Sequence, residues 1–432
     1  MRSILLHVAL ILFSSSVFAQ QTANKPDREQ WFMDLGFGMF IHWSMDSQVG
    51  AVISHSMVGA DDVYLKKFIH ELPKTFNPKK FDPDEWAVLA KLAGMKYVVF
   101  TTKHHSGFCM WDTKTTAFNV MNTAYGRDVT REIFDAFRRH DIAIGIYFSP
   151  YDLHCFYENN LPVTRAQNPL KTPIGDKGMM DLNKVQLKEL LTNYGKIDVI
   201  FFDGYPADLK EFVWSIDPEI IVTRGQMETP EQELPNQPLP GPWEACFTMG
   251  TDWQYKPTND PHKSGTEIIN MLIETRAKGG NLLLNVGPKP NGEIQIEQEA
   301  LLREVALWNL ANSETIHNVR AWKITKSDEF WFTQSKDGKS IFVFVPGGDN
   351  WRYGTRKELL IKNIKGNKNT RVSILGYGSE ILEYRKDTDA KVYVDASPDG
   401  LKVSAFNGHR FYTNNKWPNP IVLKIENAEY QK

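Results

Sequence analysis

Between about residue 31 and residue 318, short apolar runs alternate with longer segments whose apolar residues recur every three or four positions. The runs have the length of strands, and their nearly continuous apolar character is typical of strands buried on both faces of a sheet. They lie at residues 38–42, 97–101, 142–147, 197–202, 220–222 and 281–286. The segments between them predict amphipathic helices, among them residues 83–92, 128–139, 183–193 and 297–310. This alternation predicts a parallel (β/α)8-like TIM barrel over residues 20–318.

The pattern changes near Val319. From there to residue 432 the helical period is lost, and short β-branched and aromatic runs are separated by Gly, Asn and Asp. The runs lie at residues 329–333, 340–345, 371–375, 390–394 and 421–425. They predict a C-terminal antiparallel β-sandwich over residues 319–432, which we expect to brace the barrel.

The first 19 residues have the composition of a secretory signal peptide. Arg2 precedes a mostly apolar stretch from Ile4 to Val17, and Val17-Phe18-Ala19 is a small–x–small cleavage signal. The stretch is shorter than the roughly 20 apolar residues that span a membrane. We therefore expect cleavage after Ala19 and an exported protein without a membrane span. The lack of an Asn-x-Ser/Thr sequence favours a bacterial, periplasmic or secreted protein.

Composition excludes several functional classes. The 432 residues carry 50 Lys and Arg against 52 Asp and Glu, a net charge of −2. Such a balance gives no basic surface for nucleic acid. The three cysteines are far apart and contain no C-x-x-C, so they predict no zinc site. We expect them to be unpaired, although an exported chain could form one disulfide. The sequence leaves open whether the chain forms a homo-oligomer.

Polar residues follow several of the apolar runs. The carboxyl ends of barrel strands face the active site, so these residues are candidates for its chemistry. They are His42, His104, His105, Tyr147, Asp203 and Arg224. Asp203 carries the most weight, because a carboxylate directly after six apolar residues is costly to bury without partners. Acid/base chemistry on a sugar needs a second carboxylate. The candidates are Glu228, Glu231, Glu233 and Glu244.

The pair His104-His105 could in principle hold a metal ion for a metal-dependent hydrolase. Adjacent residues on a strand point to opposite faces, and no H-x-H or H-E-x-x-H sequence lies nearby. We therefore predict no metal and no cofactor, and we expect these histidines to hydrogen-bond a hydroxylated ligand.

Ordered motifs along the barrel carry a family resemblance. They include residues 37–43, 94–97, 102–108, 147–150, 202–204, 243–244 and 278–288. In these motifs the chain resembles glycoside hydrolase family twenty-nine, the α-L-fucosidases.

The resemblance implies a retaining, exo-acting hydrolase that releases L-fucose from an oligosaccharide or glycoconjugate. It implies that Asp203 is the nucleophile. Glu244 matches the acid/base of some members, while Glu231 and Glu228 stay open because this residue varies in position within the family. The residues implied to hold the sugar are His42, Trp43, His104, His105, Tyr147 and Arg224.

The sequence departs from the family in the segment after the first strand. The usual Glu-Trp pair is absent from residues 51–56, and His55 there is our candidate for a replacement contact. Ser106 stands where the family usually has Asp. Polar contacts decide which sugar a site accepts. An α-L-galactosidase or a related α-L-glycosidase is therefore an alternative, as is a non-catalytic carbohydrate-binding relative.

Overall fold

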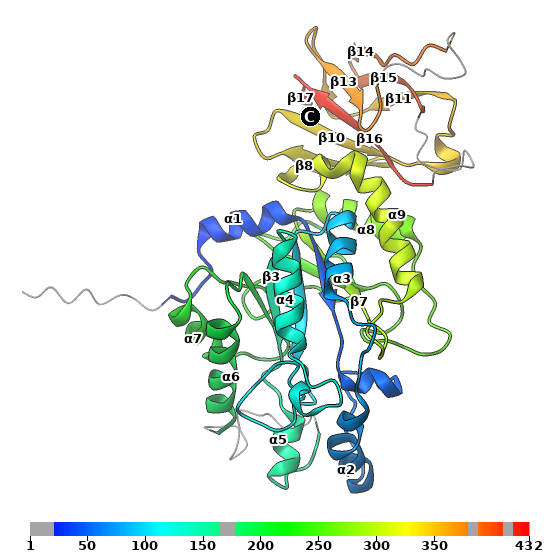
Figure 1. Cartoon of the computed structure of the whole chain (residues 1–432). Coiled ribbons are helices and arrows are strands. Elements are labelled where there is room, and N and C mark those ends of the chain that lie inside the picture. Colours follow the sequence, from blue (N-terminus) through cyan, green and yellow to red (C-terminus); the bar gives the residue numbers. More distant parts are fainter. Residues whose placement is uncertain (1–20, 165–177, 379–387, 409–417, 432) are drawn as a thin grey trace, which may run out of the picture.

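The computed structural model describes residues 21–164, 178–378, 388–408 and 418–431. The predicted signal peptide lies outside the described residues. In Figure 1 the chain forms an α/β unit in the lower part of the view and an all-β unit above it.

The α/β unit is built around a seven-stranded parallel sheet in the order β5-β4-β3-β2-β1-β7-β6. Isolated β-bridges connect the segment 224–231, which follows β5, to Trp243 and to Cys246 of β6. They extend the strand pairing from β5 toward β6. The sheet is therefore (β/α)8-like, which confirms the predicted fold class. The strands are β1 (Phe37–Ile41), β2 (Tyr97–Lys103), β3 (Ala143–Phe148), β4 (Val199–Phe202), β5 (Ile221–Val222), β6 (Glu244–Thr248) and β7 (Asn281–Val286).

Helices pack around this sheet (Figure 1). They are α1 (Pro26–Leu35), α3 (Pro83–Ala93), α4 (Val129–Arg139), α6 (Met180–Asn193), α7 (Leu209–Ile216), α8 (Gly265–Ala277) and α9 (Ile296–Asn312). Side chains cap several of them; Asp128 accepts a hydrogen bond from the Arg131 amide at the start of α4. Two further helices, α2 (Asp62–His70) and α5 (Leu153–Glu158), lie at the lower end of the barrel with the loops that follow the strands.

Strand alternation divides the apolar residues into two sets. One set forms an aromatic interior, and it includes Phe40, Val99, Tyr147, Phe201, Cys246 and Leu283. The other set faces the helices and forms the larger core. In the interior, Gly38 leaves room for the ring of Tyr97, since a Cβ at Gly38 would lie 2.4 Å from Cζ of that ring. The ring of Tyr97 can therefore occupy the amino-terminal end of the barrel.

The all-β unit is the predicted antiparallel sandwich. A five-stranded sheet in the order β13-β16-β10-β9-β8 and a three-stranded sheet in the order β11-β15-β14 share an apolar core, with a small β12-β17 pair beside them. The strands are β8 (Val319–Ser327), β9 (Phe330–Ser335), β10 (Ser340–Val345), β11 (Arg356–Ile361), β12 (Ile364–Lys365), β13 (Arg371–Ile374), β14 (Tyr393–Ser397), β15 (Gly400–Phe406), β16 (Ile421–Glu426) and β17 (Glu429–Tyr430). We retain 20–318 and 319–432 as the proposed domain limits.

The sandwich packs on α8 and α9. Trp308 of α9 donates a hydrogen bond from Nε1 to the Pro420 carbonyl at 2.8 Å, and its ring stacks on Phe344 of β10. These contacts lie at the upper end of the barrel in Figure 1, away from the loops at the carboxyl ends of the strands. The described residues of the sandwich therefore lie apart from the carboxyl end, where the site chemistry is expected.

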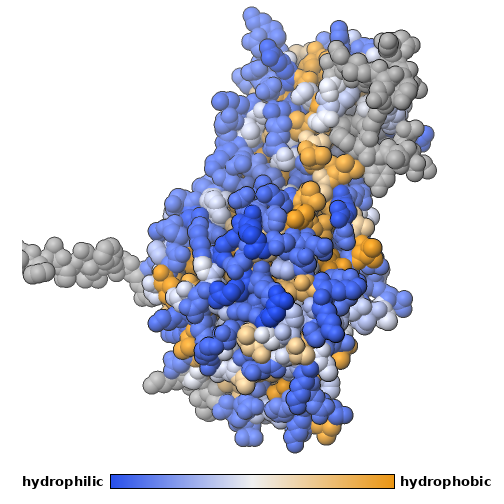
Figure 2. Space-filling model, viewed as in Figure 1, coloured by the Kyte–Doolittle hydropathy of each residue, from blue (hydrophilic) through white to orange (hydrophobic). Residues whose placement is uncertain are grey.

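On the face shown in Figure 2, hydrophilic residues predominate and hydrophobic residues form separate patches. Among the described helices, none is both long and apolar enough to cross a membrane.

Arg276 joins several segments at the amino-terminal end of the barrel. The side chain is buried, and its guanidinium donates to the carbonyls of Met33, Gly280 and Ile316 and to the amide oxygen of Asn281. Burial lowers the pKa of Arg276 to about 10, with nearby Arg320 adding to the effect. The group therefore stays charged at neutral pH, and its cost of burial is offset by these acceptors.

We expect Arg276→Ala to lower the free energy of unfolding by at least about 3 kcal/mol, because several buried acceptors would lose their donor together. Urea unfolding followed by circular dichroism measures this change. Arg303→Ala is the matched control: Arg303 is exposed on α9 and paired with Glu299, so its loss should cost less than about 1 kcal/mol. Equal losses in the two variants would contradict the role assigned to Arg276.

Candidate active site

A cavity of about 230 Å³ lies where the carboxyl ends of the barrel strands meet. It is smaller than the roughly 300–1,000 Å³ of sites for drug-sized ligands, so its size suits a ligand of about one sugar ring. The cavity is lined by Phe40, His42, Ser54, His55, His104, His105, Tyr147, Phe201, Asp203, Arg224, Glu231, Cys246 and Trp253. Eight of the ten site residues predicted from the sequence are in this set.

Asp203 follows β4 directly and receives contacts from three other segments of the barrel. The Tyr147 hydroxyl donates to Oδ2 at 2.5 Å, and His105 Nε2 lies 3.3 Å from the same oxygen. Arg224 Nη1 donates to Oδ1 at 3.4 Å. Burial alone would raise the pKa of Asp203, but the attraction of His105, the Tyr147 hydrogen bond and the charge of Arg224 outweigh it and lower the pKa. Asp203 is therefore an anion at neutral pH.

His104 and His105 both lie beside Asp203. His104 Nε2 is 4.0 Å from Oδ2, and His105 is held on its other side by Ser149, whose Oγ lies 2.6 Å from Nδ1. The expectation that the two rings point to opposite faces is wrong, because β2 ends at Lys103 and strand alternation stops there. The ligand atoms of His104, His105 and Asp203 lie within 4.8 Å of one another, a spacing that a metal ion could use. The absence of a metal stays a prediction.

His42 is neutral and its tautomer is fixed. Burial lowers the pKa of His42 to about 4. Asn285 donates from Nδ2 to the Trp253 carbonyl at 2.6 Å, which directs its amide oxygen to His42 Nδ1 at 2.7 Å. Since that oxygen only accepts, Nδ1 carries the proton and Nε2 is left as an acceptor. A hydrogen-bond acceptor of this kind suits a ligand hydroxyl.

Arg224 connects two carboxylates. Besides Asp203, its Nη1 donates to Glu231 Oε2 at 2.8 Å. The guanidinium is positioned by Thr229, which accepts from Nε and Nη2, and it lies over the ring of Phe201. Glu231 is more exposed than Asp203, with 43% of its side-chain surface accessible against 25%. The cavity therefore contains one sheltered and one more exposed carboxylate around a shared cation.

The structure places Glu244 and Trp43 elsewhere. Glu244 is the first residue of β6, two positions before Cys246, and is fully buried in the amino-terminal half of the barrel. Its carboxylate accepts a hydrogen bond from the Tyr97 hydroxyl at 2.5 Å. Trp43 follows His42 by one residue and so faces the helices, where its ring packs on Phe76 and Trp86. Both placements correct the expectation that these residues reach the site.

Five cavity residues were missed by the sequence analysis: Phe40, Ser54, Phe201, Cys246 and Trp253. Three of them had a usable signal, because Phe40 and Phe201 precede His42 and Asp203 by two residues and Cys246 follows Glu244 by two. Residues two apart on a strand share a face. Ser54 and Trp253 lie in loops, for which the sequence pattern gives no orientation.

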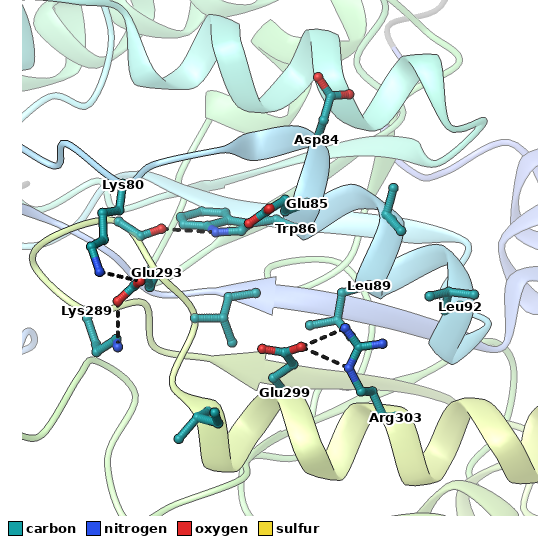
Figure 3. A pocket seen from close by; sticks show the side chains of 14 residues that line it. Lys80, Asp84, Glu85, Trp86, Leu89, Leu92, Lys289, Glu293, Glu299 and Arg303 are labelled. Atoms are coloured by element: carbon teal, nitrogen blue, oxygen red, sulfur yellow. Dashed lines mark hydrogen bonds and ion pairs between the residues drawn. The ribbon is translucent and has the colours of Figure 1, made fainter.

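A larger groove of about 560 Å³ lies on the outside of the barrel between α3 and α9 (Figure 3). Five of its charged side chains pair with one another: Lys80 and Lys289 with Glu293, and Arg303 with Glu299. None of the site residues predicted from the sequence lines this groove. We therefore assign the candidate chemistry to the smaller cavity.

Comparisons with known proteins agree with this geometry. A family model described as Alpha-L-fucosidase matches residues 12–314. The plasma alpha-L-fucosidase of Pongo abelii is 26% identical over 401 residues, which cover 81% of this chain and 82% of that protein. The tissue alpha-L-fucosidase of Homo sapiens is 27% identical, with 84% of each chain covered. The solved structure of alpha-L-fucosidase isoenzyme 1 from Paenibacillus thiaminolyticus superposes with a TM-score of 0.74 at 28% identity, covering 94% of this chain and 99% of that one.

The buried Glu244 makes stability depend on pH. Burial raises the pKa of Glu244 from its ordinary 4.5 to about 7, so the folded protein binds this proton more tightly than the unfolded chain does. The proton on Glu244 adds its full contribution to the free energy of unfolding below pH 4.5, the pKa in the unfolded chain. This contribution is lost as the pH rises to 7, the pKa in the folded protein. We expect the free energy of unfolding of the wild type to fall, relative to Glu244→Gln, by roughly 2–3 kcal/mol between pH 5 and pH 8.

Urea unfolding at several pH values tests this expectation. Glu299→Gln, a substitution on the surface of α9, should keep the pH dependence of the wild type. If Glu244→Gln also keeps it, the carboxyl group does not carry the proton assigned to it.

Proposed function

This chain belongs to the α-L-fucosidase family and is thus a glycoside hydrolase, and we propose that it acts by a retaining mechanism with Asp203 as the nucleophile and Glu231 as the acid/base. The observation that carries the proposal is the shared contact of Asp203 and Glu231 with Arg224 at the mouth of a cavity of one-sugar size. A terminal α-L-fucosyl group is the substrate that fits it.

The separation of the two carboxylates supports a retaining mechanism. Arg224 Nη1 lies 3.4 Å from one carboxylate oxygen and 2.8 Å from the other, so these oxygens are at most 6.2 Å apart, the sum of the two distances. Retaining enzymes place their carboxyl groups about 5–5.5 Å apart, whereas inverting enzymes need about 6.5–9.5 Å to admit a water between them. The limit on this pair of oxygens is compatible with the retaining distance.

Asp203 has the environment that a nucleophile needs. It is ionised at neutral pH and held in one orientation by Tyr147 and His105. Its attack on the anomeric carbon would give a covalent glycosyl-enzyme, with the leaving oxygen protonated from the opposite side. Water activated by the same acid/base would then release the sugar.

Glu231 fits the acid/base role better than Glu244. Glu231 lines the cavity and is partly exposed, so it can exchange a proton with solvent and reach a leaving group at the cavity mouth. Glu244 lies in the barrel interior, bonded to Tyr97. A proton donor must come within about 3 Å of the oxygen that it protonates, which Glu244 cannot do from the interior.

We propose that the sugar hydroxyls are bound by His42, His55, His104 and Arg224. His42 Nε2 accepts, while the Arg224 guanidinium donates. His55 occupies the cavity wall with Ser54, whose Oγ lies 2.7 Å from His55 Nδ1 and holds the ring.

The Ser54–His55 wall favours one second candidate, an α-L-galactosidase. L-Galactose is L-fucose with an added hydroxyl on C6, and a polar wall can pair with that hydroxyl where an apolar one cannot. The kcat/KM for an aryl α-L-fucoside against that for the matching α-L-galactoside decides between the two sugars.

We also propose that the chain is exported, with cleavage of the signal peptide after Ala19. The predicted leader and the family relatives named as plasma enzymes support this. Amino-terminal sequencing of protein purified from its natural source should then begin at Gln20.

We expect Asp203→Asn to lower kcat on an aryl α-L-fucoside by about a thousandfold or more, because the neutral amide cannot form the covalent intermediate. Steady-state kinetics measures the loss, and Glu244→Gln serves as the control that should stay within about fivefold of the wild type. Turnover by Asp203→Asn at the wild-type rate would remove Asp203 from the mechanism. A collapse of activity in Glu244→Gln would instead return Glu244 to the acid/base role.

We expect the effect of Glu231→Gln to depend on the leaving group. A good aryl leaving group needs no proton, so kcat/KM, which reports the first step, should fall little, whereas kcat/KM for a fucosyl disaccharide should fall by about 10²–10⁴-fold. Parallel kinetics on the two substrates measures this difference. Equal losses on both substrates would show that Glu231 binds the sugar and does not protonate the leaving oxygen.

A further inference from the structure

Tyr205 is an exposed aromatic residue directly beside the nucleophile. It follows Asp203 by two residues, and 74% of its surface is accessible. Other exposed tyrosines have their hydroxyls bound: that of Tyr64 donates to the Ser56 carbonyl and that of Tyr393 to Asp389. Within the described part of the chain, Tyr205 has no comparable hydrogen bond. Its ring is therefore free to receive a ligand.

The backbone before Tyr205 is fixed against the site. Gly204 has a φ of +129°, in the region that favours glycine, and a Cβ there would lie 3.2 Å from the ring of Tyr151. The Tyr151 ring contacts His105 edge-on at a centroid distance of 5.6 Å. The backbone at Gly204, just before Tyr205, thus lies against the ring of Tyr151, which in turn packs on the cavity residue His105.

The backbone after Tyr205 is fixed on the other side. Pro206 is buried, and its Cγ lies 3.1 Å from the Cβ position of Gly225, the residue after Arg224. A residue before proline is restricted to extended conformations. Tyr205 therefore has little backbone freedom, although its side chain is mostly in solvent.

A fixed backbone under an exposed aromatic side chain is a preorganised surface. Ordering a flexible tyrosine upon binding would cost conformational entropy, and most of that cost is already met here by Gly204 and Pro206. Tyr205 follows β4 at the carboxyl end of the barrel, two residues beyond Asp203, which lines the cavity. The cavity holds about one sugar ring, so whatever is attached to that ring must extend beyond the cavity lining.

We propose that Tyr205 forms a subsite for the leaving group, in which its ring stacks on the sugar residue to which the terminal fucosyl group is linked. This subsite rests on the proposed function and adds to it the class of substrate: a fucosyl oligosaccharide, with a sugar ring in the aglycone position. Glu231, which we propose as the proton donor to the leaving oxygen, shares Arg224 with Asp203. The contact of Pro206 with Gly225 joins the Tyr205 backbone to the residue that follows Arg224. The flat apolar face of a tyrosine suits the C–H face of a pyranose, and its hydroxyl can bond to a ring substituent.

The test compares two substrates that differ only in the presence of an aglycone sugar. α-L-Fucosyl fluoride has a leaving group that cannot stack, whereas a fucosyl disaccharide places a second ring at the rim. For Tyr205→Ala we expect kcat/KM to fall about five- to tenfold on the disaccharide and to stay within twofold on the fluoride. Tyr205→Trp keeps an aromatic face and should retain activity on both substrates.

Tyr393→Ala is the matched control, because Tyr393 is exposed on β14 of the sandwich, at the end of the molecule away from the cavity. It should leave both substrates unchanged. The subsite is overturned if Tyr205→Ala hydrolyses the disaccharide like the wild type, or if it loses activity equally on both substrates. If the wild type hydrolyses the fluoride but Tyr205→Ala shows no selective loss, only the subsite fails. If the wild type hydrolyses neither substrate, the proposed function fails with it.

Discussion

The site depends on keeping one largely buried carboxylate ionised. Burial opposes this charge, and the barrel compensates by bringing partners for Asp203 from separate strand ends: Tyr147 from β3, His105 from beyond β2 and Arg224 from beyond β5. None of these side chains is near Asp203 in the sequence. Their convergence is a consequence of strand order and register, because the carboxyl ends of neighbouring parallel strands meet at one rim.

The two ends of the barrel contain different kinds of polar groups. At the amino-terminal end, the buried Arg276 donates to nearby carbonyls, the Tyr97 hydroxyl donates to Glu244, and the sandwich packs beside them. At the carboxyl end, the polar groups of His42, Asp203 and Arg224 are directed into a cavity. Stabilising charge networks and reactive groups are thereby kept apart, which lets one end be rigid while the other presents its polar groups to a ligand.

The sequence was sufficient for the fold class and for most of the polar side chains that line the cavity, and physical reasons explain where it was not. Continuous apolar runs located the strands, and the polar residues after them, Asp203 among them, reached the cavity. Glu244 was misjudged because its assignment followed the family motif, although Glu244 precedes the apolar residues Ala245–Phe247 and therefore opens the strand. Trp43 faces away from His42 although both lie beyond the end of β1, an orientation that the structure shows through its packing on Phe76 and Trp86. Trp253 and Ser54 come from loops, whose paths are set by packing between segments far apart in the chain.

The separation of the sandwich from the cavity has a practical consequence. An attachment made through the sandwich, whether to a resin, an electrode or a fused second enzyme, would leave the barrel mouth pointing away from the support (Figure 1). Large glycoconjugates could then approach without steric hindrance from the carrier, so this architecture suits immobilisation by its carboxyl-terminal half.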